Sequence, residues 1–234
     1  MHYRDGQYFE LSFRQFFFYF IFSLTLDALG NALSVSTNLG SAPWTAGAAN
    51  LSKLTGFPIA LFLGLTTVLV ATANIFFSGK LNWKRFFGNI LFGVLFSLMV
   101  GIFNGWLAVL HLNQLPIYEK IIIDIAGLAT VGVGISIYQR VNVILHPIDD
   151  LTNILRFSYF KGSAPKAQMS NFIVAIFISL TCWLLSGTVV ALNIGTAFAF
   201  ICQGSIIAWS DRHVFPALVH GNMEQSHKDI PQQS

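Results

Sequence analysis

Charged residues are scarce in this sequence. They make up 10% of its 234 residues, whereas 54% of the residues are hydrophobic. A soluble domain covers its surface with roughly 25% charged residues, so this composition excludes an ordinary water-soluble domain. Several apolar runs are as long as the ~20 residues that a helix needs to cross a bilayer. The sequence therefore predicts an all-α polytopic membrane protein, with the lipid bilayer as its surroundings.

Cysteine and enzyme motifs are also lacking. Cys182 and Cys202 both lie within apolar runs, which favours small buried residues over a disulfide or a metal pair. The sequence has no nucleotide-binding loop, nucleophile elbow, zinc-protease motif or paired catalytic carboxylates. We therefore expect neither enzyme activity nor a cofactor. Nucleic acid is not an expected partner, because the basic residues fall in short turns between apolar runs.

Six apolar segments are long enough to span a membrane. We expect these spans at about residues 15–37, 56–78, 86–108, 118–141, 166–186 and 189–210. Residues 1–14 form an interfacial lead-in, residues 109–117 an extracellular hinge, and residues 212–234 a polar, partly disordered tail. With six spans, all Lys and Arg residues except Lys53 and Lys120 fall on the side that holds both termini, which is 11 of 13. The positive-inside rule then predicts that both termini are cytoplasmic.

The chain repeats one order of segments: span, interruption, span, turn, span. The first copy covers residues 15–108 and the second covers residues 118–211. Three landmarks recur 104 residues later, namely Gly30, Asn38 and Pro43 as Gly134, Asn142 and Pro147. Because three spans is an odd number, the second copy must enter the membrane upside down. The sequence therefore predicts two inverted three-helix repeats, an arrangement that commonly serves alternating access in secondary transporters.

Each repeat is interrupted after its first span, at residues 38–55 and 142–165. Pro43 and Pro147 suit the first turn of a short helix. One interpretation buries both short helices near the interface between the repeats. The other lays them along the two membrane faces as amphipathic helices, which the aromatic residues of FSYF at 157–160 favour.

The segment LGSAPWTAGAANLSKLTG at 39–56 resembles the signature that follows the first span in the YczE/YyaS/YitT-like integral membrane proteins, in particular the YczE type. HPIDDLTNILRF at 146–157 is similar to that family's Pro-hydrophobic-Asp-Asp segment. The resemblance covers residues 15–212 and implies a bacterial protein of the cytoplasmic membrane, in a family for which transport is often suspected. In the family an acidic residue often follows the Pro-Trp pair, whereas this chain has Thr45 there, so a symmetric pair of acidic loops is not expected.

Span 1 places polar residues on one helical face, namely Asp27, Asn31, Ser34 and Asn38. A carboxylate near the middle of a span costs a few kcal/mol, so Asp27 should face protein or water rather than lipid. We expect Asp27 to bind a proton or a cation, with Asn31 and Ser34 as neighbouring ligands. The alternative is a hydrogen-bonded contact between helices.

The first interruption offers Ser41, Pro43, Trp44 and Thr45 as candidate binding residues. They supply hydroxyl groups, an aromatic wall and a helix N-terminus, which suits an anionic group of a substrate. Trp44 could equally anchor the chain at the membrane interface.

The second interruption offers Asn142, His146, Pro147, Asp149 and Asp150. In the functional interpretation an aspartate is a cytoplasmic-side ligand or gate, and the histidine titrates near neutral pH. In the structural one, the proline and the acids simply begin the helix well. A metal site is not expected, because no helical His or Cys partner lies nearby in the sequence.

Three other polar residues have mainly structural interpretations. Asp124 is expected to reach the interface or to pair with Lys120, and Arg140 to extend from the last turn of its helix toward water. Gln203 is a weaker candidate for lining a cavity.

The sequence as a whole favours a secondary transporter of a small polar or amphipathic solute, with proton coupling through Asp27. A homodimer is plausible because six spans enclose little volume. A non-transporting membrane factor that assists or regulates a partner complex is the main alternative, and an ion channel is a third.

Overall fold

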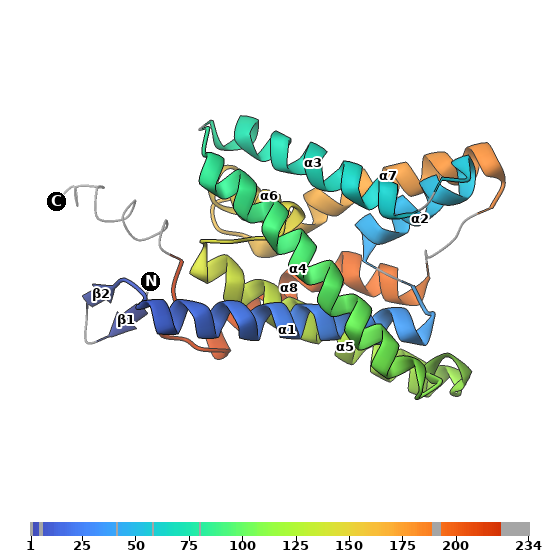
Figure 1. Cartoon of the computed structure of the whole chain (residues 1–234), viewed down its shortest axis with the longest axis horizontal. Coiled ribbons are helices and arrows are strands. Elements are labelled where there is room, and N and C mark those ends of the chain that lie inside the picture. The colour runs from blue at the N-terminus through green and yellow to red at the C-terminus, as the bar shows by residue number, and fades with distance from the viewer. Residues whose placement is uncertain are drawn as a thin grey trace.

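The computed structural model describes residues 2–4, 7–40, 42–57, 59–79, 81–188 and 193–220. Almost all of this chain is helical (Figure 1). The elements are β1 (His2–Arg4), β2 (Gln7–Phe9), α1 (Phe13–Thr37), α2 (Pro43–Thr55), α3 (Ile59–Ser78), α4 (Trp83–Ala108), the short 3₁₀ helix η1 (Leu112–Gln114), α5 (Ile117–Val141), α6 (Pro147–Ser158), α7 (Ala164–Ser186) and α8 (Ile194–His213).

The helices form two layers. In one layer α1 packs along α5, with α4 against α1 and α8 against α5. In the other, α2 packs against α7, α3 against α6, and α6 against α7. Figure 1 shows α3 and α7 in the upper part of the molecule and α1 and α5 in the lower part. Each layer therefore combines two helices from the first half of the chain with two from the second.

The contact between α1 and α5 is close because glycines face each other. A Cβ atom on Gly30 would lie 2.5 Å from the carbonyl oxygen of Gly127, and one on Gly134 would lie 2.8 Å from that of Ser23. No larger residue fits at such distances. Small residues allow helices to approach each other closely in lipid, so the two helices meet backbone to backbone at the centre of their layer.

Five helices are long and apolar enough to cross a membrane: α1, α3 counted from Leu61, α4, α5 and α7. The outward side chains of these helices are mostly apolar, such as Phe76 and Leu184, each 80% exposed. Such a surface suits lipid rather than water. The helix composition is that of a polytopic membrane protein. The sixth expected span, at 189–210, is not among the five: its residues 189–192 lie outside the described residues, and the rest lies in α8, whose apolar run is interrupted by Gln203 and ends at Asp211 and Arg212.

The ends of the expected spans agree well with the structure. Five helices end at the predicted residues, which are 37, 78, 108, 141 and 186. Four of these ends are followed by a residue with positive φ: Asn38 at 55°, Gly79 at 65°, Asn142 at 54° and Gly187 at 68°. The left-handed conformation, which Gly and Asn tolerate best, terminates a helix. At each of these four residues the chain leaves one layer for the other.

The two short helices are packed among the long ones. On α6 the polar face is turned inward, and Asp149, Asp150, Asn153 and Arg156 are all buried. Asn74 of α3 donates a 2.9 Å hydrogen bond to the carbonyl oxygen of Pro147 at the start of α6. This packing favours the interpretation in which the short helices are buried over the one in which they lie on the membrane faces.

The first residues contain a hairpin that the sequence did not predict, because strands of three residues carry little signal. β1 and β2 are antiparallel, with His2 opposite Phe9. The backbone N–H of Tyr3 donates to the carbonyl oxygen of Ala217, 2.8 Å away, so this hairpin is joined to the segment after α8. α1 begins two residues earlier than expected, because Ser12 and Gln15 form a capping box before Phe13.

Candidate functional site

The first turns of α2 and α6 are built alike. Each helix begins at a proline, Pro43 or Pro147, directly after a residue in extended conformation, Ala42 or His146. Neither preceding residue makes a side-chain capping bond. Proline stabilises this position because its fixed φ suits the first helical turn. Both first turns face the space between the two layers.

A cavity of about 380 Å³ lies between the layers. Its walls include residues from all eight α-helices of the described chain. Six residues of the predicted site line it: Asp27, Asn31, Trp44, Thr45, His146 and Asp149. They come from both halves of the chain, as the repeat suggested. The volume lies within the range of small-molecule binding sites.

Asp27 and Asp149 are the two acids of this cavity. Their residues are 3% and 8% exposed. The hydroxyl of Tyr138 donates a 2.6 Å hydrogen bond to Oδ2 of Asp149, and both of these side chains interact electrostatically with Asp27. Asn31 donates from Nδ2 to Oδ1 of Asp27 at 3.0 Å. The two carboxyl groups and the phenol therefore form one electrostatic cluster.

Among the described residues of the cavity wall, the pair has no cationic neighbour at neutral pH. Burial raises the pKa of Asp149 to about 7. Nδ1 of His146 lies 3.7 Å from Oδ2 of Asp149, but burial lowers the pKa of His146 to about 4. The imidazole is therefore neutral near pH 7, contrary to the expectation that it titrates there. Asp149 is the group on α6 that can exchange a proton near neutral pH.

Two glutamines in the cavity wall have buried side-chain atoms without hydrogen-bond partners. Gln203 on α8 is 2% exposed, and both its Nε2 and its Oε1 are unpaired. Gln168 on α7 is 1% exposed, with Oε1 unpaired. Gln203 was a weak candidate from the sequence and Gln168 was not identified, because one glutamine in an apolar run does not reveal which way it points.

Trp44 is fixed in the cavity wall and not held at an outer surface. Its Nε1 donates to Oδ1 of Asn171 on α7 at 3.2 Å. Nδ2 of Asn171 donates in turn to Oγ1 of Thr152, 2.7 Å away, and to the carbonyl oxygen of Ile148. One asparagine therefore joins α2 and α6 beside the cavity.

The other predicted site residues have structural positions. Ser41 lies outside the described residues. Asn38 and Asn142 end α1 and α5, and Pro43 and Pro147 begin α2 and α6. The hydroxyl of Ser34 donates to Asp124 of α5.

Asp150, which is fully buried, forms an ion pair with the partly exposed Arg85 away from the cavity. Arg85 donates from Nε to both carboxylate oxygens, at 3.0 and 2.9 Å, and from Nη2 to Oδ1, and Nδ2 of Asn89 is a third donor at 2.9 Å. Nη2 of Arg85 also donates to Oδ1 of Asn142. A carboxylate with these partners holds α6 against α4, so we assign Asp150 to the fold.

Two structural expectations from the sequence were wrong. Asp124 is buried against Ser34, while Lys120 donates to the carbonyl oxygen of Asn113. Arg140 does not extend to water: it is 1% exposed, and Nη1 donates to the carbonyl oxygens of Phe215 and Leu218, each 3.0 Å away. Residues far apart in the sequence supply these partners, so local spacing could not predict them.

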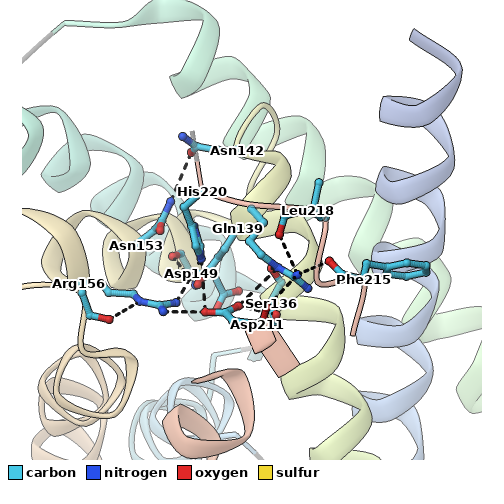
Figure 2. Close-up of polar contacts among 12 residues, drawn as sticks. Ser136, Gln139, Asn142, Asp149, Asn153, Arg156, Asp211, Phe215, Leu218 and His220 are labelled. Carbon is cyan, nitrogen blue, oxygen red and sulfur yellow. Dashed lines mark hydrogen bonds and ion pairs between the residues drawn. The ribbon is translucent and has the colours of Figure 1, made fainter. Parts of the chain in front are cut away.

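A second polar cluster surrounds Asp211 at the end of α8 (Figure 2). Arg156 donates to Oδ2 of Asp211 and Ser136 to Oδ1, each at 2.6 Å. His220 lies 3.4 Å from the same Oδ2. Figure 2 shows Asp211 between these side chains and beside the segment that carries Phe215 and Leu218. The cluster connects α5, α6 and α8 with residues 214–220, and it lies outside the cavity wall.

Among the described residues, no group of three His, Cys, Asp or Glu side chains could hold a metal ion. Fold and site together define a class: a helical polytopic membrane protein with a buried acidic cavity between two layers. Within it, the chain belongs to a family of unknown function, DUF6198, which matches residues 13–212. The resemblance to the YyaS-like proteins is confirmed at this level.

Two bacterial proteins are similar to this chain in sequence. The chain is 29% identical to the uncharacterized protein YyaS of Bacillus subtilis over 145 residues, which cover 60% of this chain and 68% of YyaS. It is 23% identical to an uncharacterized protein of Haemophilus influenzae over 188 residues, which cover 80% and 79% of the two chains. No solved structure gives a significant match.

Proposed function

We propose that the protein is a secondary transporter of a small polar or amphipathic solute in the bacterial cytoplasmic membrane. Helices α1, α3, α4, α5, α7 and α8 would be its six spans, arranged as two inverted halves with both termini in the cytoplasm. Protons would couple to the solute through Asp27. The observation that carries the proposal is the pair of buried carboxyl groups in a cavity between two helical layers, because intramembrane ionisable groups mark ion and substrate pathways.

Matching helix boundaries support the inverted halves. α1 and α5 each contain 25 residues, and both their first and their last residues are 104 positions apart in the sequence. The residues that end them, Asn38 and Asn142, have nearly the same backbone angles, φ 55° and ψ 33° against φ 54° and ψ 39°. α2 and α6 also begin 104 residues apart.

Matching contacts between helices also support the two inverted halves. A Cβ on Gly30 would meet O of Gly127 and N of Val131, while one on Gly134 would meet O of Ser23 and N of Asp27. Positions 23 and 27 lie 104 residues before 127 and 131, so each contact has a counterpart with the halves exchanged. The packing of α2 on α7 and of α6 on α3 is another such pair. A pseudo-twofold axis between α1 and α5 accounts for both.

Proteoliposome flux is the direct test. Purified protein would be reconstituted with a pH-sensitive dye inside the vesicles and challenged with a panel of solutes. We expect a solute to drive proton movement, and we expect Asp27→Asn to abolish it. Asp124→Asn is the matched control, since this carboxyl is also buried in the α1–α5 contact but lies outside the cavity wall.

The opposite results are equally clear. Solute flux that moves no protons and is unchanged in Asp27→Asn would contradict the coupling. No flux with any solute, together with an intact cellular phenotype in Asp27→Asn, would contradict transport and favour the non-transporting partner role.

A further inference from the structure

We propose that the cavity binds an amphipathic organic cation. Its ammonium group would lie beside the Asp27–Asp149 pair, its apolar body against the aromatic and aliphatic wall, and a hydrogen-bonding group near Gln203. This inference rests on the proposed function, because it assigns the chemical class of solute to the same cavity.

The charge of the cavity wall selects for a cation. Among the described residues that line it, Asp27 and Asp149 are acidic and none is Lys or Arg. The guanidinium of Arg85 on α4 is already bound to Asp150, and Arg85 is not one of the residues that line the cavity. Since charges interact strongly when little water separates them, an anion would be repelled by the ionised pair, whereas a cation would compensate it.

The unpaired amide of Gln203 is an independent sign of a ligand. A buried polar group without a partner costs roughly 1–3 kcal/mol, and here both the donor and the acceptor of one side chain are unpaired. Oε1 of Gln168, on the neighbouring helix α7, is in the same state. A hydroxyl, carbonyl or amide group of the solute could satisfy Gln203, because its side chain both donates and accepts.

The remaining wall favours an organic ion over an inorganic one. Phe96, Val100, Leu128 and Phe172 line the cavity, and they would contribute nothing to the binding of a hydrated metal ion. They suit an apolar body, and the aromatic faces of Phe96 and Trp44 can add cation–π attraction for an ammonium group. The cavity of about 380 Å³ admits a solute of one aromatic ring and a short amine chain.

Binding of a cation should displace a proton from the acidic pair. The titratable groups that face the pair are Tyr138 of α5 and His146 of α6, with the Asp150–Arg85 ion pair behind Asp149. The wall residues on α2, α3, α4, α7 and α8 add no ionisable side chain. Proton release on binding is therefore assigned to Asp27 and Asp149, the two carboxyl groups that contact the cation.

The test uses the full chain in lipid nanodiscs and three probes of similar shape: phenethylamine, 2-phenylethanol and 3-phenylpropanoate. Isothermal titration at pH 7.5 in two buffers of different ionisation enthalpy would measure affinity and proton release together. We expect the amine to bind at least tenfold more tightly than the alcohol, with release of protons, and the anion not to bind. Alcohol affinity equal to that of the amine, or binding of the anion alone, would overturn the proposal.

Variants then assign the groups. Asp27→Asn and Asp149→Asn should each weaken amine binding at least tenfold, while Asp124→Asn should leave it unchanged. 2-Amino-1-phenylethanol adds a hydroxyl to phenethylamine, and its gain in affinity should vanish in Gln203→Leu. Unchanged amine affinity in both cavity aspartate variants would contradict the assignment. Should a variant fail to fold, the affinities of the three probes for the native protein still show whether the cavity prefers a cation.

The binding test and the flux test fail separately. Tight amine binding without any flux in proteoliposomes would overturn transport and leave the cation site standing. Proton-coupled flux of an anion, without amine binding, would support transport and overturn the cation site.

Discussion

The hydroxyl of Tyr138 donates a 2.6 Å hydrogen bond to Oδ2 of Asp149, across the boundary between α5 and α6. Asp27 on α1 interacts electrostatically with the same phenol and with Asp149. An acid of the first half of the chain and an acid of the second half therefore belong to one electrostatic cluster at the cavity wall.

Removal of this hydroxyl should change the pH dependence of binding. The hydrogen bond from Tyr138 lowers the pKa of Asp149 against the larger effect of burial, which raises it. In Tyr138→Phe the pKa of Asp149 should therefore rise above about 7. We expect the pH at half-maximal amine binding to move upward by about one pH unit or less, since a hydrogen bond contributes ~1 kcal/mol. Tyr159→Phe, at an exposed position, should change nothing.

Asp149 should make stability depend on pH. Its pKa is raised to about 7 in the folded chain and is about 4 when unfolded. The unfolded chain therefore loses this proton first, and the stabilisation present below pH 4 is lost as the pH rises through 7. Thermal unfolding of Asp149→Asn should show a smaller fall in melting temperature between pH 5 and pH 8 than the native protein. An identical fall in both would contradict the raised pKa.

Arg85 and Asp150 should behave as a pair in unfolding experiments. Arg85→Met leaves the carboxylate of Asp150 buried with Asn89 as a remaining donor. Loss of one partner of a buried ion pair costs about 3 kcal/mol or more, whereas replacing both partners with apolar residues is often tolerated. The double variant Arg85→Met/Asp150→Leu should therefore be more stable than Arg85→Met alone. A double variant no better than the single one would show that the pair does not act as a unit.

The α1–α5 contact should tolerate no added methyl group. Gly30→Ala and Gly134→Ala would each place a Cβ within 2.8 Å of a backbone oxygen of the opposite helix, so each should lower stability by about 1–3 kcal/mol. Gly64→Ala and Gly101→Ala are matched controls, because nothing lies within 4 Å of their Cβ positions. The controls should be neutral or slightly stabilising. A similar loss of stability in Gly30→Ala and Gly134→Ala would agree with the proposal that the two glycines make equivalent contacts in the two inverted halves.

Arg140 should hold the segment after α8 in place. Its guanidinium donates to the carbonyl oxygens of Phe215 and Leu218, and one planar group can make several such bonds at fixed angles, whereas a lysine ammonium cannot. In Arg140→Lys, amide hydrogen exchange should become faster for residues 214–220 and remain unchanged in the middle of α1. Exchange that is equally fast along both segments would indicate general unfolding instead.

Local chemistry accounts for what the sequence could predict. Prolines and left-handed residues are visible in the sequence, so helix ends such as Asn38 and helix starts such as Pro147 were predicted closely. Asp27 was identified as a candidate because a carboxylate in an apolar run is costly unless it is satisfied. Its place in the cavity wall agrees with that argument.

Tertiary packing accounts for what was missed. Ser34 and Asp124 are 90 residues apart and form one hydrogen bond, and Arg140 finds its acceptors more than 70 residues later in the chain. Gln168 lies in the cavity wall only because α7, which packs against α2 and α8, turns that face toward the cavity. Which polar residue meets which depends on the layer arrangement, and no local pattern encodes it.

The four left-handed residues that end helices where the chain changes layer have a mechanical consequence. α1 and α5 touch through their backbones, so they cannot slide along each other without collision. In the proposed transport cycle, access to the cavity would therefore come from a rotation of the layer that contains α2, α3, α6 and α7. Asn38, Gly79, Asn142 and Gly187 join the two layers and would be the hinge residues of that rotation.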